Sequence, residues 1–243
     1  MSAYRSLSRN LLKFDLRDWS TLIFTFIFPA ALLIILVLTL GDAYDGMNLT
    51  GPISANVIAF GAAFVGIYAG ATHLALWREN GMFNVLRNFP LSSNTVLGAQ
   101  ATAGTVLLLV QALLLFVIAI VMGTRPVATA PLALVPVILG YLLFFFLGVL
   151  LGIVVPSMAG VSMAATVIII PLGMIGGAMM PMELMPDWVQ TIGPFTPVYH
   201  MREAISMTLI GEGTWHDAGI GLGYLIGVGA VCGLLAQRTM RFK

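Results

Sequence analysis

The stretch RENGMFNVLRNFPLSSNTVLG, residues 78–98, decides the fold because it is a short polar segment between two long apolar runs. The run before it covers residues 53–76, and the run after it covers residues 98–123. About 20 apolar residues in a helix cross the ~30 Å hydrocarbon core of a bilayer. Each run is therefore long enough to span a membrane, and the polar stretch is predicted to lie on one side of it.

Composition extends this interpretation to the whole chain. Hydrophobic residues make up 59% of the 243 residues and charged residues only 9%, whereas a soluble domain has about 25% charged residues. We therefore predict an all-α polytopic membrane protein in which residues 1–243 form a single transmembrane domain. The six predicted spans are residues 20–40, 53–76, 98–123, 130–154, 159–180 and 217–236.

Basic residues predict the orientation of the spans, because short cytoplasmic loops are enriched in Lys and Arg. With the N-terminus inside, only Arg125 and Arg202 of the eleven basic residues lie outside. An odd number of spans would separate the basic N-terminus from the basic C-terminus. We predict a multi-pass protein of the cell (inner) membrane, with both termini and residues 78–98 in the cytoplasm. A net charge of +1 gives no indication of a nucleic-acid partner.

Residues 3–18 are predicted to form an amphipathic helix in the interface of the membrane. One face of this helix carries Tyr4, Leu7, Leu11 and Phe14. The opposite face carries Arg5, Arg9, Lys13 and Arg17. Such a helix lies along the headgroups with its bases toward anionic lipid or water. Asp15 and Asp18 fall toward the apolar side, where Asp18 can cap the first span. A solvated helix that merely precedes the span is the alternative.

The predicted spans contain almost no ionisable residue, which argues against an ion-driven pump and against an enzyme acting inside the membrane. A charge in lipid is costly, and ionisable groups there mark transport pathways. His73, near the cytoplasmic end of the second span, is the exception. We expect it to bond to a neighbour or to reach the interface. Gln100 and Gln111 are the notable polar groups of the third span.

The sequence contains no GxSxG elbow and no HExxH pair, the signatures of hydrolases and zinc peptidases. Its two lysines, Lys13 and Lys243, do not follow the Gly-rich loop that cradles nucleotide phosphates. We predict that the chain is not an enzyme, has no catalytic residues, and binds no metal or cofactor of its own. Any energy for work is expected to come from another chain. The one cysteine, Cys232, is interpreted as a packed thiol.

Residues 181–210 are too polar and too rich in proline to cross the membrane. We predict short re-entrant helices at the outer interface, where aromatic rings with polar edges settle; an ordinary external loop is the alternative. The residues that mark this segment are Pro181, Pro186, Trp188, Pro194, Pro197 and Tyr199.

Span six carries Gly219, Gly223 and Gly227 in GxxxGxxxG register, and Gly229 and Gly233 continue a second ridge. Small residues let helix backbones approach closely in lipid. Packing within the chain is favoured over a seam between two copies.

The opening stretch itself predicts a short amphipathic helix followed by a turn. Its exposed apolar residues need a partner, and Pro90 ends the helix. Ser92, Ser93 or Asn94 can cap the next helix, which continues into span three.

Three features together resemble the ABC-2 type permease subunits of ATP-binding cassette exporters, including the daunorubicin-resistance-like membrane proteins. The first is RENGMFNVLRNFPLSSNTVLGAQ (78–100), and the second is GGAMMPMELMPDW (176–188) with IGPFTPVYHMREAI (192–205). The third is the layout of basic amphipathic helix, FIFPA in span one, six spans and a short basic tail. The chain departs from the family pattern at Asn84 and Asn88, where acidic or threonine residues are frequent.

The resemblance implies a half-transporter that exports an amphiphilic substrate such as a drug, a lipid or a lipopeptide. Two permeases, as a homodimer or a heterodimer with a similar chain, would assemble with two ATPase subunits that bind ATP and Mg. Residues 79–91 would form the coupling helix in a cleft of the ATPase, and residues 3–18 the connecting helix. The implied ATPase contacts are Arg78, Glu79, Gly81, Phe83, Leu86, Arg87, Phe89, Pro90 and Leu91. The competing interpretations are an ATP-independent channel or secondary transporter, a membrane-embedded enzyme, and a structural or assembly protein.

Overall fold

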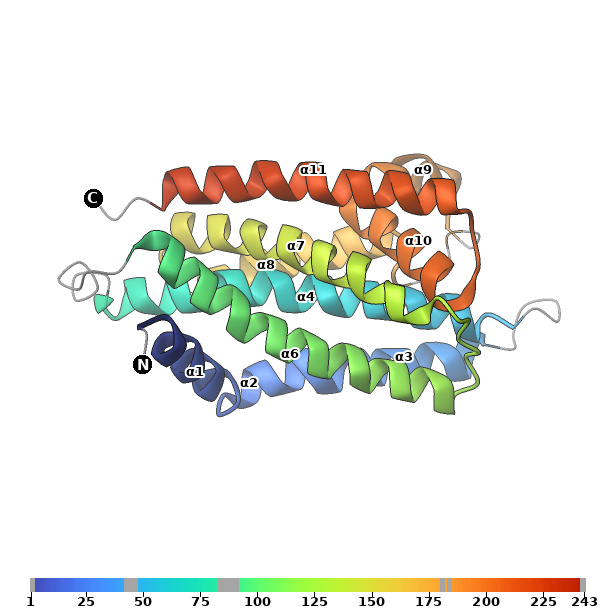
Figure 1. Ribbon diagram of the computed structural model, residues 1–243, viewed down its shortest axis with the longest axis horizontal. Helices are drawn as coiled ribbons and strands as arrows, with labels where there is room; N and C mark the ends of the chain where they lie inside the picture. Colours follow the sequence, from blue (N-terminus) through green and yellow to red (C-terminus); the bar gives the residue numbers. More distant parts are fainter. Residues whose placement is uncertain (1–2, 42–47, 83–91, 180–181, 183–184, 241–243) are drawn as a thin grey trace.

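The computed structural model describes residues 3–41, 48–82, 92–179, 182 and 185–240, and these residues contain helices and no strand. The long helices run side by side in one bundle (Figure 1). The described elements are α1 (Ala3–Asp15), α2 (Trp19–Leu22), η1 (Ile23–Ile27), α3 (Phe28–Leu40), α4 (Thr50–Glu79), α6 (Ser93–Val121), η2 (Ala130–Ala133), α7 (Leu134–Val154), α8 (Met158–Ile175), α9 (Asp187–Ile192), η4 (Gly193–Phe195), α10 (Pro197–Ile210) and α11 (Trp215–Thr239).

Among the described residues, six helical stretches are long and apolar enough to cross a membrane, which confirms the predicted all-α polytopic fold. They are Ile23–Leu40, α4, α6, η2 with α7, α8, and α11. The fifth is shorter than the predicted 159–180, because α8 ends at Ile175. Gly177 there has a φ of 74°, a conformation that glycine adopts readily and that ends the helix.

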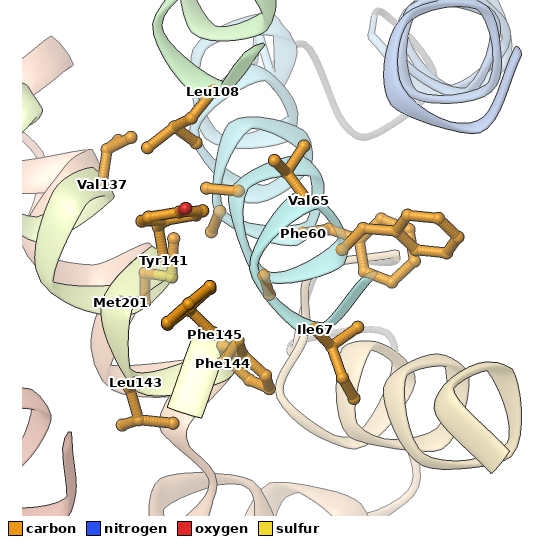
Figure 2. Close-up of a cluster of buried hydrophobic side chains, with 14 of the residues drawn as sticks. Phe60, Val65, Ile67, Leu108, Val137, Tyr141, Leu143, Phe144, Phe145 and Met201 are labelled. Carbon is orange, nitrogen blue, oxygen red and sulfur yellow. The ribbon is translucent and has the colours of Figure 1, made fainter. Parts of the chain in front are cut away.

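Helix α4 is the centre of the bundle. It contacts α3, α6, α7, α8 and α10, and 89% of its most apolar window is buried, against 22% for α8 and for α11. A helix that is buried on all sides has no polar face, and the sequence of α4 alternates large apolar residues with Gly and Ala. The large side chains Phe60 and Ile67 of α4 pack into the fully buried cluster shown in Figure 2.

The closest helix contact joins α4 to α7, and glycines on both helices make it possible. A Cβ atom added to Gly70 would lie 2.0 Å from the backbone oxygen of Phe145, and one added to Gly148 would lie 2.1 Å from that of Ile67. Phe144 and Phe145 of α7 are fully buried beside this contact (Figure 2). Small residues thus bring the two backbones together, as expected where lipid provides no hydrophobic drive.

Span one contains a proline whose structural cost is offset by a neighbouring helix. Pro29 lacks the N–H that would bond to the carbonyl of Thr25, four residues earlier. Gln111 of α6 donates its Nε2 to that same carbonyl at 2.7 Å. The freed carbonyl is therefore satisfied from outside the helix, as membrane helices with internal proline require, and the predicted polar residue of span three has a structural role.

Both chain ends lie at one end of the bundle, which we call the N/C end (Figure 1). Tyr4 donates its hydroxyl to the carbonyl of Gly98 at 3.2 Å, and Ser93 donates to the carbonyl of Met240 at 2.7 Å. The start of α1, the start of α6 and the end of α11 therefore meet there. An even number of spans requires this arrangement.

Helices α9 and α10 lie toward the opposite end and do not cross the bundle (Figure 1). At the start of α10, the backbone oxygen of His200 would lie 2.8 Å from a Cβ on Gly221, six residues into α11 and thus about 9 Å below its first residue. The last turn of α10 reaches the rim, where Leu209 accepts a hydrogen bond from Val127 N at 3.0 Å. The segment therefore enters the bundle and returns to the same end.

We predict that Gly148→Ala lowers the thermal melting midpoint of the purified protein in detergent. Its methyl group would meet the α4 backbone, which cannot move aside as a flexible side chain would, and overpacking costs about 1–3 kcal/mol. Gly227→Ala in α11 is the matched control, because a Cβ there meets no atom within 4 Å. Equal melting midpoints for the two variants would contradict the close α4–α7 contact.

Candidate functional site

The candidate site is the N/C end, where α4 leads into the stretch quoted at the start of the sequence analysis. Of the residues predicted to contact an ATPase there, the structure describes Arg78, Glu79 and Gly81. Phe83, Leu86, Arg87, Phe89, Pro90 and Leu91 lie outside the described residues. Ser92 caps α6 and accepts from Thr95 N at 3.2 Å, which confirms the prediction that Ser92, Ser93 or Asn94 caps the helix leading into the third span.

Arg78 and Glu79, at the end of α4, both hold the turn between α7 and α8. Arg78 Nη1 donates to the carbonyl of Val155 at 3.5 Å, and Glu79 Oε2 accepts from Met158 N at 3.0 Å. Met158 is the first residue of α8, and an N–H in the first turn of a helix has no partner within the helix. A carboxylate is favourable at this position. The two residues thus connect α4 to α8 within the chain.

Helix α1 has the predicted amphipathic character. Leu11 is buried in the core, and Leu7 packs against it. The whole helix contacts α6. The four basic residues Arg5, Arg9, Lys13 and Arg17 are exposed. The bundle of the same chain therefore covers the apolar face at Leu7 and Leu11, whereas Tyr4 and Phe14 of that face stay partly exposed. The basic face is free to meet water or lipid headgroups.

The structure explains why Asp15 falls on the apolar side of α1. His73 Nε2 of α4 lies 2.9 Å from Asp15 Oδ1, and both residues are buried, with exposed fractions of 4% and 7%. The imidazole nitrogen is within ion-pair distance but its N–H is not aligned as a hydrogen bond to the carboxylate. Phe14 covers the imidazole edge-on, with ring centroids 5.5 Å apart. His73, the ionisable exception in the spans, therefore contacts Asp15, the residue that interrupts the apolar face of α1.

Asp18, three residues after Asp15, caps the start of the first span. Its Oδ2 accepts from Thr21 N at 3.1 Å and from the Thr21 hydroxyl at 2.7 Å. Aspartate is favourable before the first residue of a helix, because it satisfies an N–H of the first turn. The prediction that Asp18 caps the first span is confirmed.

Comparison with known proteins agrees with this geometry. Residues 3–210 match the family described as ABC-2 type transporter. This chain belongs to the ABC-2 type transporter family. It is 29% identical over 156 residues to a Bacillus subtilis (strain 168) protein named "Putative transport permease YvfS". That match covers 61% of this chain and 62% of the relative, so the chain spans less than two thirds of the relative's length. Family membership confirms the resemblance to ABC-2 type permeases inferred from the sequence.

Helix α10 of this ABC-2 family chain contains a charged pair that sequence reasoning did not single out. Arg202 Nη2 lies 2.7 Å from Glu203 Oε1, with side-chain exposures of 11% and 25%, and the guanidinium lies 4.9 Å from the centre of the Tyr199 ring. Burial raises the pKa of Tyr199 and lowers that of His200. The alternation of aromatic and charged residues in YHMRE is the signal that could have indicated this cluster.

The other marked residues of the segment lie nearer the surface. Trp188 is 60% exposed, as expected for an interfacial tryptophan. Pro186 is exposed, and Pro194 and Pro197 are half-buried. Pro181 lies outside the described residues.

The glycines of α11 do not all pack within the chain of this family member, although the sequence predicted that they would. A Cβ on Gly219, Gly223 or Gly227 would meet no atom within 4 Å, so this register does not pack against another described helix of the chain. The second ridge does pack, because a Cβ on Gly229 would lie 3.6 Å from Leu143 of α7. Intramolecular packing was the wrong expectation for the first register, since α11 turns its other side to α7 and α10.

Among the described residues, no three His, Cys, Asp or Glu side chains form a group that could hold a metal ion. Cys232 is a buried free thiol. The N/C end thus combines helix ends, a basic surface and the buried contact between His73 and Asp15.

We expect Asp15→Ala and His73→Ala each to destabilise the protein by about 1–3 kcal/mol, because each removes the close polar neighbour of a buried polar group. The double variant should lose less than the sum of the two single variants, since it removes both groups. Thermal melting midpoints in one detergent give the comparison. Asn10→Ala, at an exposed position of α1, is the control, and single variants as stable as this control would contradict the pair.

Proposed function

We propose that this chain is the membrane-spanning permease half of an ABC exporter, driven by a separate ATPase subunit. The observation that carries the proposal is that α4 ends and α6 begins at the N/C end of a family member. Residues 83–91 belong to the sequence that connects these two helices. These residues include apolar side chains in a polar stretch, and burying one such side chain in a protein partner is worth about 1.5–3 kcal/mol. An ATPase cleft is the partner that family membership implies.

The contacts of the described residues support a route by which such a partner moves the permease. A displacement of residues 83–91 acts directly on the ends of α4 and α6. From α4 it passes to α8 through Glu79 and the amide of Met158, and to α1 through His73 and Asp15. Helices α1 and α8 would then move with the coupling segment, because each is fastened to the same end of α4.

The sequence also supports an external source of energy. It lacks a phosphate-binding loop, so ATP and Mg are assigned to the ATPase, in two copies. A second permease, identical or similar, would complete the substrate path. Only 22% of the apolar window of α8 and of α11 is buried in the single chain, and lipid or a second permease would cover the rest. The substrate class proposed is amphiphilic, because the spans offer apolar surface with few charges, and the direction proposed is outward.

Substitution within the coupling segment tests the proposal. Phe83→Asp and Leu86→Asp should release the ATPase, or leave it bound without stimulation of ATP turnover, because a carboxylate cannot be buried in an apolar cleft without a large cost. Co-purification of the ATPase and ATP turnover are the two measurements. Phe195→Asp, at a 77% exposed position near the opposite end, is the control. Normal binding and turnover in both test variants would sink the proposal.

Labelling tests the proposed orientation separately. In a Cys232→Ala background, Met82→Cys should react with a membrane-impermeant maleimide in inside-out vesicles but not in intact cells. Val127→Cys, near the opposite end, should show the reverse pattern. Met82 and Val127 are 44% and 38% exposed, so both thiols are accessible. Labelling of Met82→Cys from outside intact cells would invert the topology and refute the docking of an ATPase at the N/C end.

A channel or secondary transporter is the alternative function. It predicts substrate flux in proteoliposomes that contain the permease without its ATPase and without ATP, whereas the exporter predicts flux only with both. The scarcity of ionisable residues in the spans favours the exporter, because ion-coupled transporters place such residues on the ion pathway.

A further inference from the structure

A groove of about 570 Å³ lies between α6, α7 and α11. In Figure 1, α7 runs between the other two helices. Small residues of α6 and α11 leave room for the groove, which is bordered by larger side chains. Those small residues are Gly98, Ala101, Gly229, Ala230 and Gly233. Among the larger ones, Leu234 is 58% exposed. The volume is within the range of small-molecule sites, about 300–1,000 Å³.

The groove becomes polar where it reaches the N/C end. Asn94 of α6 and Gln237 of α11 both line it, and Gln237 Nε2 donates to Asn94 Oδ1 at 3.3 Å. One hydrogen bond leaves each amide group with further N–H donors. Ser93 fixes the same end by its bond to the carbonyl of Met240. The apolar groove is therefore closed at this end by two amides that can donate to an anion.

Arg238 follows Gln237 in α11 and adds a positive charge at this end of the helix. Arg238 is exposed and follows Leu234 of the groove wall by one helical turn, so the two side chains share a face of α11. None of the ion pairs found among the described residues includes Arg238. The charge is thus available at the depth where the polar end of the groove meets the membrane surface.

We propose that this groove is a binding site for an anionic phospholipid, with one acyl chain along α7 and the phosphate beside Arg238 and the amides of Asn94 and Gln237. Hydrocarbon is the occupant expected for the groove itself, because α6, α7 and α11 all cross the membrane. The acyl chain gives little selectivity, since lipid tails are as apolar as the groove wall. The headgroup supplies the selectivity, because Arg near the membrane surface attracts anionic lipid.

Charge favours a lipid over a second copy of the chain as the occupant. A helix of another copy could fill the apolar part, but it would have to bring an anion to the polar end. In the proposed topology, the polar end of the groove lies in the cytoplasmic leaflet. Binding of the lipid depends on neither the topology nor the ATPase, so the two proposals fail independently.

Native mass spectrometry of the purified full-length chain tests the site. The protein is incubated with equal amounts of palmitoyl-oleoyl phosphatidylglycerol and phosphatidylcholine, and bound lipids are counted per chain. The wild type should retain phosphatidylglycerol preferentially. Arg238→Gln should reduce that preference about fivefold, the effect of one basic residue near the surface. Ala230→Phe, which fills the groove from an exposed position, should reduce the retention of both lipids.

Matched controls separate the site from general effects of charge and bulk. Val231→Phe adds the same ring at a 57% exposed position of α11 that does not line the groove. Arg125→Gln removes an exposed cation near the opposite end. Both controls should behave as wild type. Equal retention of the two lipids by the wild type would overturn the proposal, as would equal effects of Arg125→Gln and Arg238→Gln. Loss of a dimer in Ala230→Phe with unchanged lipid retention would do the same, since the groove would then be a contact between copies.

Discussion

The backbone contact between α4 and α7 is the constraint on which the rest of the bundle depends. Lipid gives helices no hydrophobic reason to associate, so close packing must supply the attraction. Gly70 and Gly148 remove the side chains that would hold the two backbones apart. Once α7 is seated, α4 is covered on that side, and α3, α6, α8 and α10 cover the others. The packing of α4 against its neighbours thus depends on the glycine positions, where a side chain is absent.

Polar side chains fasten the outer helices to this centre. Gln111 holds α6 to the first span through the carbonyl that Pro29 leaves free. Gln100 donates to the carbonyl of Ala69 in α4 at 2.7 Å, and Asp15 meets His73. In a medium without water, an unsatisfied polar group costs several kcal/mol, so each contact has few alternatives. Because polar groups are scarce in the spans, each of these polar contacts specifies which helices pair.

The N/C end was partly predictable. The caps at Asp18 and Ser92 follow from local chemistry, because an oxygen acceptor before a helix satisfies an N–H a few residues on. The bonds of Arg78 and Glu79 to the turn between α7 and α8 did not follow from the sequence. Their assignment to an ATPase contact stays a prediction. The partner of a charged side chain at a helix end depends on where the neighbouring helices lie. The assignments to residues 83–91 remain predictions.

The sequence by itself determined the number of spans, the helical fold and the amphipathic first helix, because these depend on the length and period of apolar runs and on the cost of exposing backbone to lipid. Only the tertiary structure decided which face of each helix turns inward. The GxxxGxxxG register of α11 faces outward while Gly229 packs on α7, and Asp15 finds its partner 58 residues away in the sequence. In lipid, apolar residues are stable on both faces of a helix. Hydrophobicity therefore cannot mark the inner face, and small residues and rare polar contacts decide it.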